Sequence, residues 1–274
     1  MSLQSNDLRY RLGFIGGGKL AGSVLRGLVR AGFCAPEEII VSEPNEFARD
    51  SLGTGLGVKV TAVNAEVAED AEIILIGVKP GVVLDVVESI AGGGADKQVI
   101  SLAAGVGVAS MEAKGAARFM RAMTNTPAAV CQAATAITRG SRTTDTDIAR
   151  ARAIFSAVGS VVEVPESMID AVTALGGSGP AFVYTVIEAL AAGATKCGLS
   201  PEVSLGLATQ TVRGAAQLAL ESQLSPEELR RMVITPGGTT AAGLQVMEEH
   251  DSAGGISAAV VAAAARAKEL APKS

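Results

Sequence analysis

Short apolar runs alternate with amphipathic segments over residues 1–165. Segments with helical periodicity, for example Lys19–Arg30, Glu46–Leu52 and Ile148–Val158, lie between the runs. Strands separated by crossover helices predict an α/β fold of Rossmann type, with a parallel, doubly wound sheet and the first strand–turn–helix at its centre. The expected strands are Arg11–Ile15, Ile39–Val41, Val58–Val60, Ile73–Val78, Val99–Ala103, Ala117–Ala122, Ala134–Thr138 and Val161–Val164.

The pattern changes after Pro165, where alanine-rich helical segments replace the strand-like runs. They are Ala181–Ala194, Glu202–Glu221, Pro226–Val233, Thr239–His250 and Ile256–Leu270. We therefore predict two domains, an α/β domain over residues 1–165 and an all-helical domain over residues 166–274. The helical domain is either a compact bundle or a set of helices that pack against a second subunit. The second arrangement is favoured, because a helical module of this size has limited surface to bury alone.

The composition excludes several classes of function. With 48% hydrophobic residues, 32 glycines and a net charge of −5 over 274 residues, the chain gives no electrostatic case for binding nucleic acid or an anionic membrane. Residues 1–10 lack an apolar signal core and Ile256–Ala265 is too short to span a bilayer, so we expect a cytoplasmic protein. The single histidine, His250, is expected on the surface, which leaves no triad and no metal cluster. An enzyme of this composition must take its chemistry from a cofactor.

A glycine-rich turn follows the first apolar run. Gly16, Gly18 and Ala21 fit the G-x-G-x-x-[G/A] pattern, in which the turn and the helix N-terminus hold the pyrophosphate of a dinucleotide. Such turns also occur as plain strand–helix connections. Here an acidic residue, Glu43, follows the next strand-like run, and this context favours a dinucleotide-binding domain over residues 1–165.

Residues that follow the other strands are candidates for the same site, because ligands bind at the carboxyl ends of parallel strands. Lys79 can reach a ribose or phosphate, or it is a solvated lysine before a turn. The small residues Ala103–Ala104–Gly105 would let a flat nicotinamide ring lie against the backbone. Asn125 can read the carboxamide of the cofactor or the substrate, with a simple Asx-turn as the alternative.

A second glycine cluster, Thr235–Pro236–Gly237–Gly238–Thr239–Thr240, precedes a helical segment. Its backbone N–H groups would form an anion-binding nest for a small carboxylate, and Thr239 or Thr240 can cap the helix. The alternative is an ordinary capped helix start. The candidate substrate-binding residues are Thr235, Gly237, Gly238, Thr239 and Thr240.

Six motifs occur along the chain in a characteristic order. They are FIGGGKLA (Phe14–Ala21), VKP (Val78–Pro80), SLAAGV (Ser101–Val106), MTNTPAAV (Met123–Val130), SGPAF (Ser178–Phe182) and TPGGTTAAGLQVME (Thr235–Glu248). In these motifs the chain resembles the pyrroline-5-carboxylate reductase family over nearly its whole length. The resemblance implies reduction of L-1-pyrroline-5-carboxylate to L-proline, the final step of proline biosynthesis, with NADPH or NADH.

The resemblance also implies an assembly and a set of site residues. The helical domain would form a homodimer, and larger assemblies, often decamers, would be built from it. The substrate carboxylate would lie on Gly238–Thr240, and Thr240 would face the imine nitrogen to donate or relay its proton. The residues that the resemblance places at the coenzyme are Ile15, Gly16, Gly17, Gly18, Lys19, Leu20, Asn64, Gly77, Val78, Lys79, Pro80, Ala103, Ala104 and Gly105. Ser42 and Asn125 are added to the expected coenzyme-binding residues because of their hydrogen-bonding side chains.

The chain departs from the family pattern at a few positions. Gly176 stands where a serine is common, Lys19 where Asn or Gln is frequent, and Thr235 replaces a usual serine. Different residues favour different coenzymes. Glu43 favours the free ribose diol of NADH and no arginine stands nearby, whereas Ser42 and Asn64 can bond a 2′-phosphate. We expect NADPH.

Two other functions remain open at this point. One is a two-domain dehydrogenase of the 3-hydroxyacid type, and the other is a non-catalytic dinucleotide sensor. The first is disfavoured because Gly179–Ala192 contains no lysine where that class has one. The second is disfavoured because a sensor has no need of the Thr235–Thr240 turn.

Overall fold

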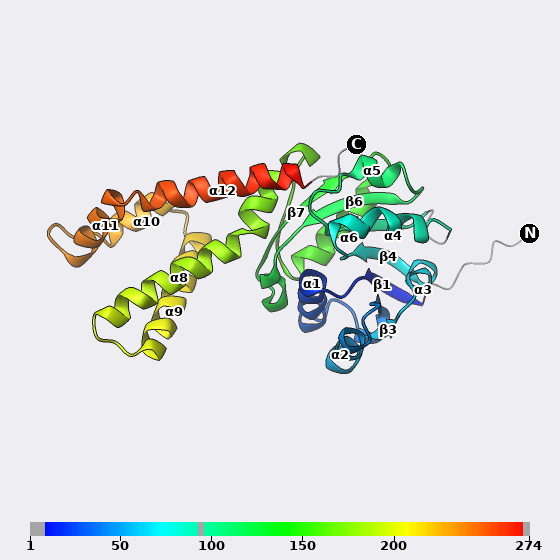
Figure 1. Ribbon diagram of the computed structural model, residues 1–274, viewed down its shortest axis with the longest axis horizontal. Helices are drawn as coiled ribbons and strands as arrows, with labels where there is room; N and C mark the ends of the chain where they lie inside the picture. Colours follow the sequence, from blue (N-terminus) through cyan, green and yellow to red (C-terminus); the bar gives the residue numbers. More distant parts are fainter. Residues whose placement is uncertain (1–8, 93–95, 271–274) are drawn as a thin grey trace, which may run out of the picture. The chain divides into compact units, whose positions relative to one another are not determined.

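The first part of the protein is built on one mixed sheet. The computed structural model describes residues 9–92 and 96–270. Within them, eight strands pair in the order β3-β2-β1-β4-β5-β6-β7-β8 (Figure 1). The strands are β1 (Tyr10–Ile15), β2 (Ile39–Ser42), β3 (Lys59–Thr61), β4 (Ala71–Ile76), β5 (Gln98–Ser101), β6 (Arg118–Met123), β7 (Ala133–Arg139) and β8 (Gly159–Glu163). The strand order reverses between β1 and β4, which confirms the predicted doubly wound topology.

The last two strands run against the other six. β1 to β6 are parallel, β7 is antiparallel to β6, and β8 is parallel to β7. The expectation of a parallel sheet throughout is therefore wrong for β7 and β8. The link from β6 to β7 holds only a short 3₁₀ turn, Thr126–Val130, instead of a crossover helix, so the chain returns beside β6 in the opposite direction. β8 is parallel to β7 because α6 (Asp145–Ser156) connects them.

Helices cover both faces of the sheet. The side chains of α1 (Lys19–Arg30), α2 (Glu46–Leu56) and α6 belong to one buried cluster with Phe14. Those of α3 (Asn64–Asp70), α4 (Val83–Ser89) and α5 (Val108–Glu112) belong to another with Ile15. Phe14 and Ile15 are neighbours on β1, and they point to opposite faces as strand geometry requires. Each is at most 1% exposed, and burial of such a side chain contributes about 1.5–3 kcal/mol.

The second part of the protein is helical. After a 3₁₀ turn (Glu166–Met168), a short helix α7 (Ile169–Val172) and a π-helical turn (Thr173–Gly177), the chain forms five further helices among the described residues. They are α8 (Gly179–Lys196), α9 (Pro201–Glu221), α10 (Pro226–Met232), α11 (Thr239–Glu249) and α12 (Ser252–Glu269). Chain contacts define two compact units, which divide at Ser178/Gly179, with residues from Ala262 onward counted in the first.

The helical unit, Gly179–Val261, has almost no core of its own. All of its residues are described, and of these only Ser204 and Ala208 are buried. Large apolar side chains on its helices are open to solvent, such as Leu207 on α9, which is 56% exposed, and Leu220, which is 78% exposed. The helical unit is therefore not the compact bundle that was one of the two expected arrangements. Exposed apolar surface of this kind marks an interaction site.

Candidate functional site

The glycine-rich turn joins β1 to α1 at the carboxyl edge of the sheet. Gly16 has φ +90°, and a Cβ there would lie 2.8 Å from Val78 Cγ1 and 3.1 Å from the Gly77 carbonyl. The Gly16 N–H donates to the Ser42 carbonyl at 2.8 Å, and the Gly77 N–H donates to the Ile15 carbonyl at 2.8 Å. These bonds tie together the ends of β1, β2 and β4, which is where the strand order reverses.

The N-terminus of α1 suits an anion. Gly18 is its N-cap residue, and among the described residues no side chain caps this end of the helix. The first turn of α1 has no acidic residue, and Gly18 and Lys19 are exposed. Free N–H groups, the positive end of the helix dipole and a lysine therefore meet at one accessible point. The Glu43 carboxylate occupies the Gly17 N–H of this turn, but the exposed N-terminus of α1 and Lys19 remain open to a pyrophosphate, so these residues fit a dinucleotide coenzyme.

A network of polar groups follows β2 and β3. The Ser42 hydroxyl donates to Asn64 Oδ1 at 2.7 Å, so these two predicted site residues do meet. The Glu43 carboxylate accepts hydrogen bonds from the Gly17 N–H at 2.9 Å and the Asn45 N–H at 3.1 Å. Both of its oxygens are thus held by the backbone.

Arg49, on α2, lies at this same corner. Its Nη1 donates to the Glu43 carbonyl at 2.9 Å. The expectation that no arginine stands near Glu43 is therefore wrong, because Arg49, six positions along the chain, reaches back to the end of β2. The signal in the sequence was an arginine in the second turn of the helix that follows Glu43.

The segment after β4 places the next group of predicted residues. Gly77 and Val78 are partly buried against the glycine-rich turn, whereas Lys79 and Pro80 are exposed. Lys79 precedes the 3₁₀ turn Pro80–Val82. This exposure agrees with either of the roles considered for Lys79, so its contact with a coenzyme stays a prediction.

The loop after β5 is held by side chains of residues that the sequence did not mark as site residues. Ala103 is 5% exposed, and Gly105 has φ +77°. Arg121, on β6 and 4% exposed, donates from Nη1 to Glu166 Oε1 at 2.9 Å and from Nη2 to the Ala103 carbonyl at 3.4 Å. Periodicity marked Arg121 only as part of a strand, and nothing in the pattern paired it with Glu166.

The side chain of Asn125 binds other parts of the protein. Its Nδ2 donates to the Gly176 carbonyl at 3.0 Å and its Oδ1 accepts from the Ala134 N–H at 3.3 Å. The residue is 7% exposed. It joins the end of β6 to β7 and to the π-helical turn. Asn125 therefore does not form the Asx-turn that was the alternative. Binding of the coenzyme carboxamide or the substrate by Asn125 stays a prediction, and only the second N–H and the second lone pair of its side-chain amide are left for it.

The second glycine cluster lies in the helical unit, before α11. Gly237 has φ +67°, and the Gly238 N–H donates to the Thr235 carbonyl at 2.9 Å. A Cβ on Gly238 would lie 2.2 Å from Thr235 Oγ1. The helix begins at Thr239 with Gly238 as N-cap, and the described residues include no side-chain cap, so the expected cap by Thr239 or Thr240 is wrong. Both threonines lie inside the helix, and the first N–H groups of α11 stay available.

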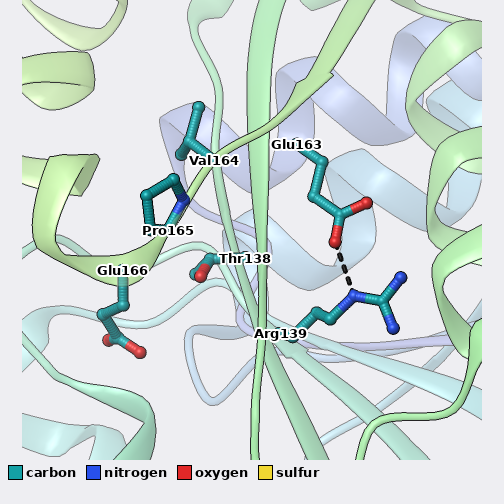
Figure 2. A pocket seen from close by; sticks show the side chains of 6 residues that line it. All are labelled: Thr138, Arg139, Glu163, Val164, Pro165 and Glu166. Atoms are coloured by element: carbon teal, nitrogen blue, oxygen red, sulfur yellow. Dashed lines mark hydrogen bonds and ion pairs between the residues drawn. The ribbon is translucent and has the colours of Figure 1, made fainter.

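A cavity of about 340 Å³ lies at the end of β7 and β8, and none of the predicted coenzyme- or substrate-binding residues lines it (Figure 2). It is lined by Thr138, Arg139, Glu163, Val164, Pro165 and Glu166. The charges in it are already paired, since Arg139 Nε donates to Glu163 Oε1 at 2.5 Å and Glu166 accepts from Arg121.

The described residues do not meet the requirements of a metal site or of a membrane-spanning helix. In residues 9–92 and 96–270 no three His, Cys, Asp or Glu side chains gather as a metal site would require. Within the same residues, no helix combines the length and apolarity needed to cross a bilayer. His250 is exposed at the end of α11, as predicted.

Two family models match parts of the chain. One, described as pyrroline-5-carboxylate reductase dimerisation, matches residues 166–270, and one described as NADP oxidoreductase, coenzyme F420-dependent, matches residues 11–105. The family-model match at 166–270 begins at the predicted domain boundary, whereas the compact units divide at Ser178/Gly179.

Full-length relatives give the same family. A pyrroline-5-carboxylate reductase of Synechocystis sp. is 44% identical over 97% of this chain and 100% of its own. The structure of a pyrroline-5-carboxylate reductase from Coxiella burnetii is 36% identical with a TM-score of 0.88, covering 97% of this chain and 100% of that one. A Plasmodium falciparum pyrroline carboxylate reductase, solved with NADP bound, is 28% identical with a TM-score of 0.87 over 96% of this chain and 98% of that one. The chain belongs to the pyrroline-5-carboxylate reductase family, whose members are NAD(P)-dependent oxidoreductases.

Proposed function

We propose that this protein reduces L-1-pyrroline-5-carboxylate to L-proline, the last step of proline biosynthesis. The observation that carries the proposal is the N-terminus of α1 behind Gly16, which no side chain of the described residues caps and which lies where the strand order reverses. The chain also aligns with a curated relative over nearly its full length. The two alternatives, a 3-hydroxyacid dehydrogenase and a dinucleotide sensor, are not favoured.

The coenzyme belongs at the carboxyl edge of the sheet. The Gly16–Leu20 turn would hold the pyrophosphate, and Ala103–Gly105 with Gly77–Pro80 would hold the nicotinamide half. NADPH is the preferred coenzyme in this proposal. The Glu43 carboxylate already accepts from two backbone N–H groups, so only its remaining lone pairs are open to a ribose diol. Arg49 and the amide NH2 group of Asn64 would supply the donors that bind a 2′-phosphate, whereas the Ser42 hydroxyl is buried and already donates to Asn64 Oδ1.

The substrate carboxylate is assigned to the turn Thr235–Thr240. Its support is the set of uncapped N–H groups at the start of α11 and the glycine at 238 that Thr235 requires. Thr240, in the first turn of α11, is assigned to the imine nitrogen. Its side chain acts by orienting that nitrogen or relaying a proton from water, because a hydroxyl is a weak acid.

The reaction needs little else from the protein. The reduced nicotinamide, when bound, supplies the hydride that adds to the carbon of the C=N bond. The chain must align the cyclic imine and exclude competing geometries, and alignment alone supplies a large part of such a rate. A nucleophile or a histidine base is not required, in agreement with the composition.

The protein works as a homodimer in this proposal, through the exposed apolar faces of α8, α9 and the following helices. The match of residues 166–270 to a dimerisation model supports it. A decamer built from such dimers and a cytoplasmic location complete the proposal.

The test is a coenzyme-oxidation assay followed at 340 nm. The protein should oxidise NADPH only when pyrroline-5-carboxylate is added, and Thr240→Ala should lower kcat by about 100-fold while the Kd for NADPH stays within about twofold. Thr240→Ser is the matched control, because it keeps the hydroxyl and should retain most of the rate. Equal rates for the Ala and Ser variants would remove the Thr240 hydroxyl from the mechanism.

A further inference from the structure

Arg121 is a buried cation in the middle of the α/β unit. It lies on β6, paired in register with Ser101, the last residue of β5. Its side chain is 5% exposed, whereas that of its ion-pair partner, Glu166, is 34% exposed. Within the described residues its Nε is buried without a hydrogen-bond partner. Burying a guanidinium in this way is costly, and an apolar side chain in such a place is often as stable. Stability alone therefore does not explain an arginine here.

The contacts of Arg121 converge on the loop that follows β5. The Ala103 carbonyl accepts from Arg121 Nη2 at 3.4 Å, and the Ala103 N–H donates to Ser101 Oγ at 3.3 Å. Both polar groups of Ala103 are thus fixed by side chains from the end of the sheet.

Glu166 fixes the far end of the same loop. Its Oε1 accepts from Arg121 Nη1 at 2.9 Å and from the Val108 N–H, at the start of α5, also at 2.9 Å. Arg121 and Glu166 together hold both ends of the segment 103–108. Gly105 and Val106, within this segment, are buried, so packing and these two anchors together hold its backbone.

We propose that Arg121, acting through Glu166 and the Ala103 carbonyl, is the positioning residue that sets the loop for the nicotinamide half of the coenzyme. The inference rests on the proposed function, which places that half on Ala103–Gly105. Arg121 does not touch the coenzyme in this account. It holds the backbone that does, so its loss moves the nicotinamide half and leaves the adenosine half, at β2 and β3, unaffected.

The experiment separates the two halves of the coenzyme by using two ligands. The Kd of NADPH is measured by fluorescence titration, and the Kd of 2′,5′-ADP, which lacks the nicotinamide half, by calorimetry. Arg121→Met should weaken NADPH by about tenfold or more, a loss of about 1.4 kcal/mol, and change 2′,5′-ADP by less than about twofold. Its kcat should fall as well, because the ring is misaligned.

A matched control comes from the same strand. Arg118, the first residue of β6, also forms an ion pair, with Asp147, with Nε to Oδ2 at 2.8 Å. Arg118→Met should lower Tm and leave the ratio of the two Kd values unchanged. If Arg121→Met behaves in the same way, or weakens both ligands in proportion, Arg121 has only a structural role and the inference is overturned.

If Arg121→Met does not fold, a milder substitution, Glu166→Gln, tests the same inference. Glu166→Gln keeps an acceptor for the Val108 N–H and removes the charge, so it should shift the Kd ratio in the same direction by a smaller factor. An unchanged ratio in a folded Glu166→Gln variant would also overturn the inference. If the unaltered protein binds both ligands but does not reduce pyrroline-5-carboxylate, the proposed function fails and the Kd ratio still tests Arg121.

Discussion

Replacing Gly16 by alanine probes the glycine-rich turn directly. The residue has φ +90°, a conformation that costs a non-glycine residue about 1–3 kcal/mol. The added Cβ would also lie 2.8 Å from Val78 Cγ1 and 3.1 Å from the carbonyl carbon and oxygen of Gly77. Overpacking of this kind costs about 1–3 kcal/mol. We expect Gly16→Ala to lower the free energy of unfolding by about 2–6 kcal/mol.

Urea denaturation followed by far-UV circular dichroism measures this loss. Gly55→Ala is the matched control, because Gly55 lies in α2 and a Cβ there meets nothing within 4 Å. It should gain about 0.5–1 kcal/mol, the usual helical preference of alanine over glycine. A double-mutant cycle with Val78→Ala separates the two costs. It should give a coupling of about 1 kcal/mol, because removing the Val78 methyls relieves only part of the clash and none of the strain in φ.

The affinity of Gly16→Ala for NADPH is the second measurement on this variant. Where Gly16→Ala is still folded, its turn must shift, and the Kd for NADPH should rise by about tenfold or more. A Gly16→Ala protein with the stability and NADPH affinity of the unaltered chain would refute the account of this turn.

Three further predictions concern coenzyme choice, acid stability and assembly. Arg49→Met should raise KM for NADPH about tenfold and leave KM for NADH nearly unchanged in steady-state assays, because only NADPH carries the 2′-phosphate. Asp147→Asn should cost about 3 kcal/mol at pH 7, measured by urea denaturation. Burial opposes ionisation of Asp147, but hydrogen bonds from Arg118 and Thr144 and the charge of Arg118 outweigh it and lower the pKa. Its contribution is therefore present above about pH 4 and disappears as the pH falls through the lowered pKa, so the loss caused by Asp147→Asn should shrink in acid. Leu207→Asp should produce monomers in size-exclusion chromatography with light scattering, whereas Val130→Asp, at an exposed apolar site in the α/β unit, should not.

Much of the fold could be predicted because its signals are local. The apolar runs and the helix Lys19–Arg30 correspond closely to observed elements, since burial on both faces of a sheet produces uninterrupted hydrophobic strands. The direction of β7 was missed because periodicity carries no information on direction. The usable signal was the length of the link from β6, which is too short for a crossover helix.

Positions in the candidate site were easier to predict where the backbone itself selects the residue than where side chains make the contacts. Gly16 could be found because a positive φ selects glycine. Arg49 and the pair Arg121–Glu166 were missed because their contacts depend on how α2 and the segment after β8 fold back on the sheet. The cap of α11 was also mistaken. Thr239 and Thr240 are favourable cap residues, but Gly238 takes that position and leaves the N–H groups of α11 without a side-chain cap among the described residues.

The most direct test is the product balance of the reaction itself. The purified protein is mixed with NADPH and pyrroline-5-carboxylate, and both the coenzyme oxidised and the proline formed are measured. We expect one proline for each NADPH consumed, with no oxidation when the substrate is omitted. A folded protein that binds NADPH yet forms no proline would contradict the assignment of pyrroline-5-carboxylate as its substrate.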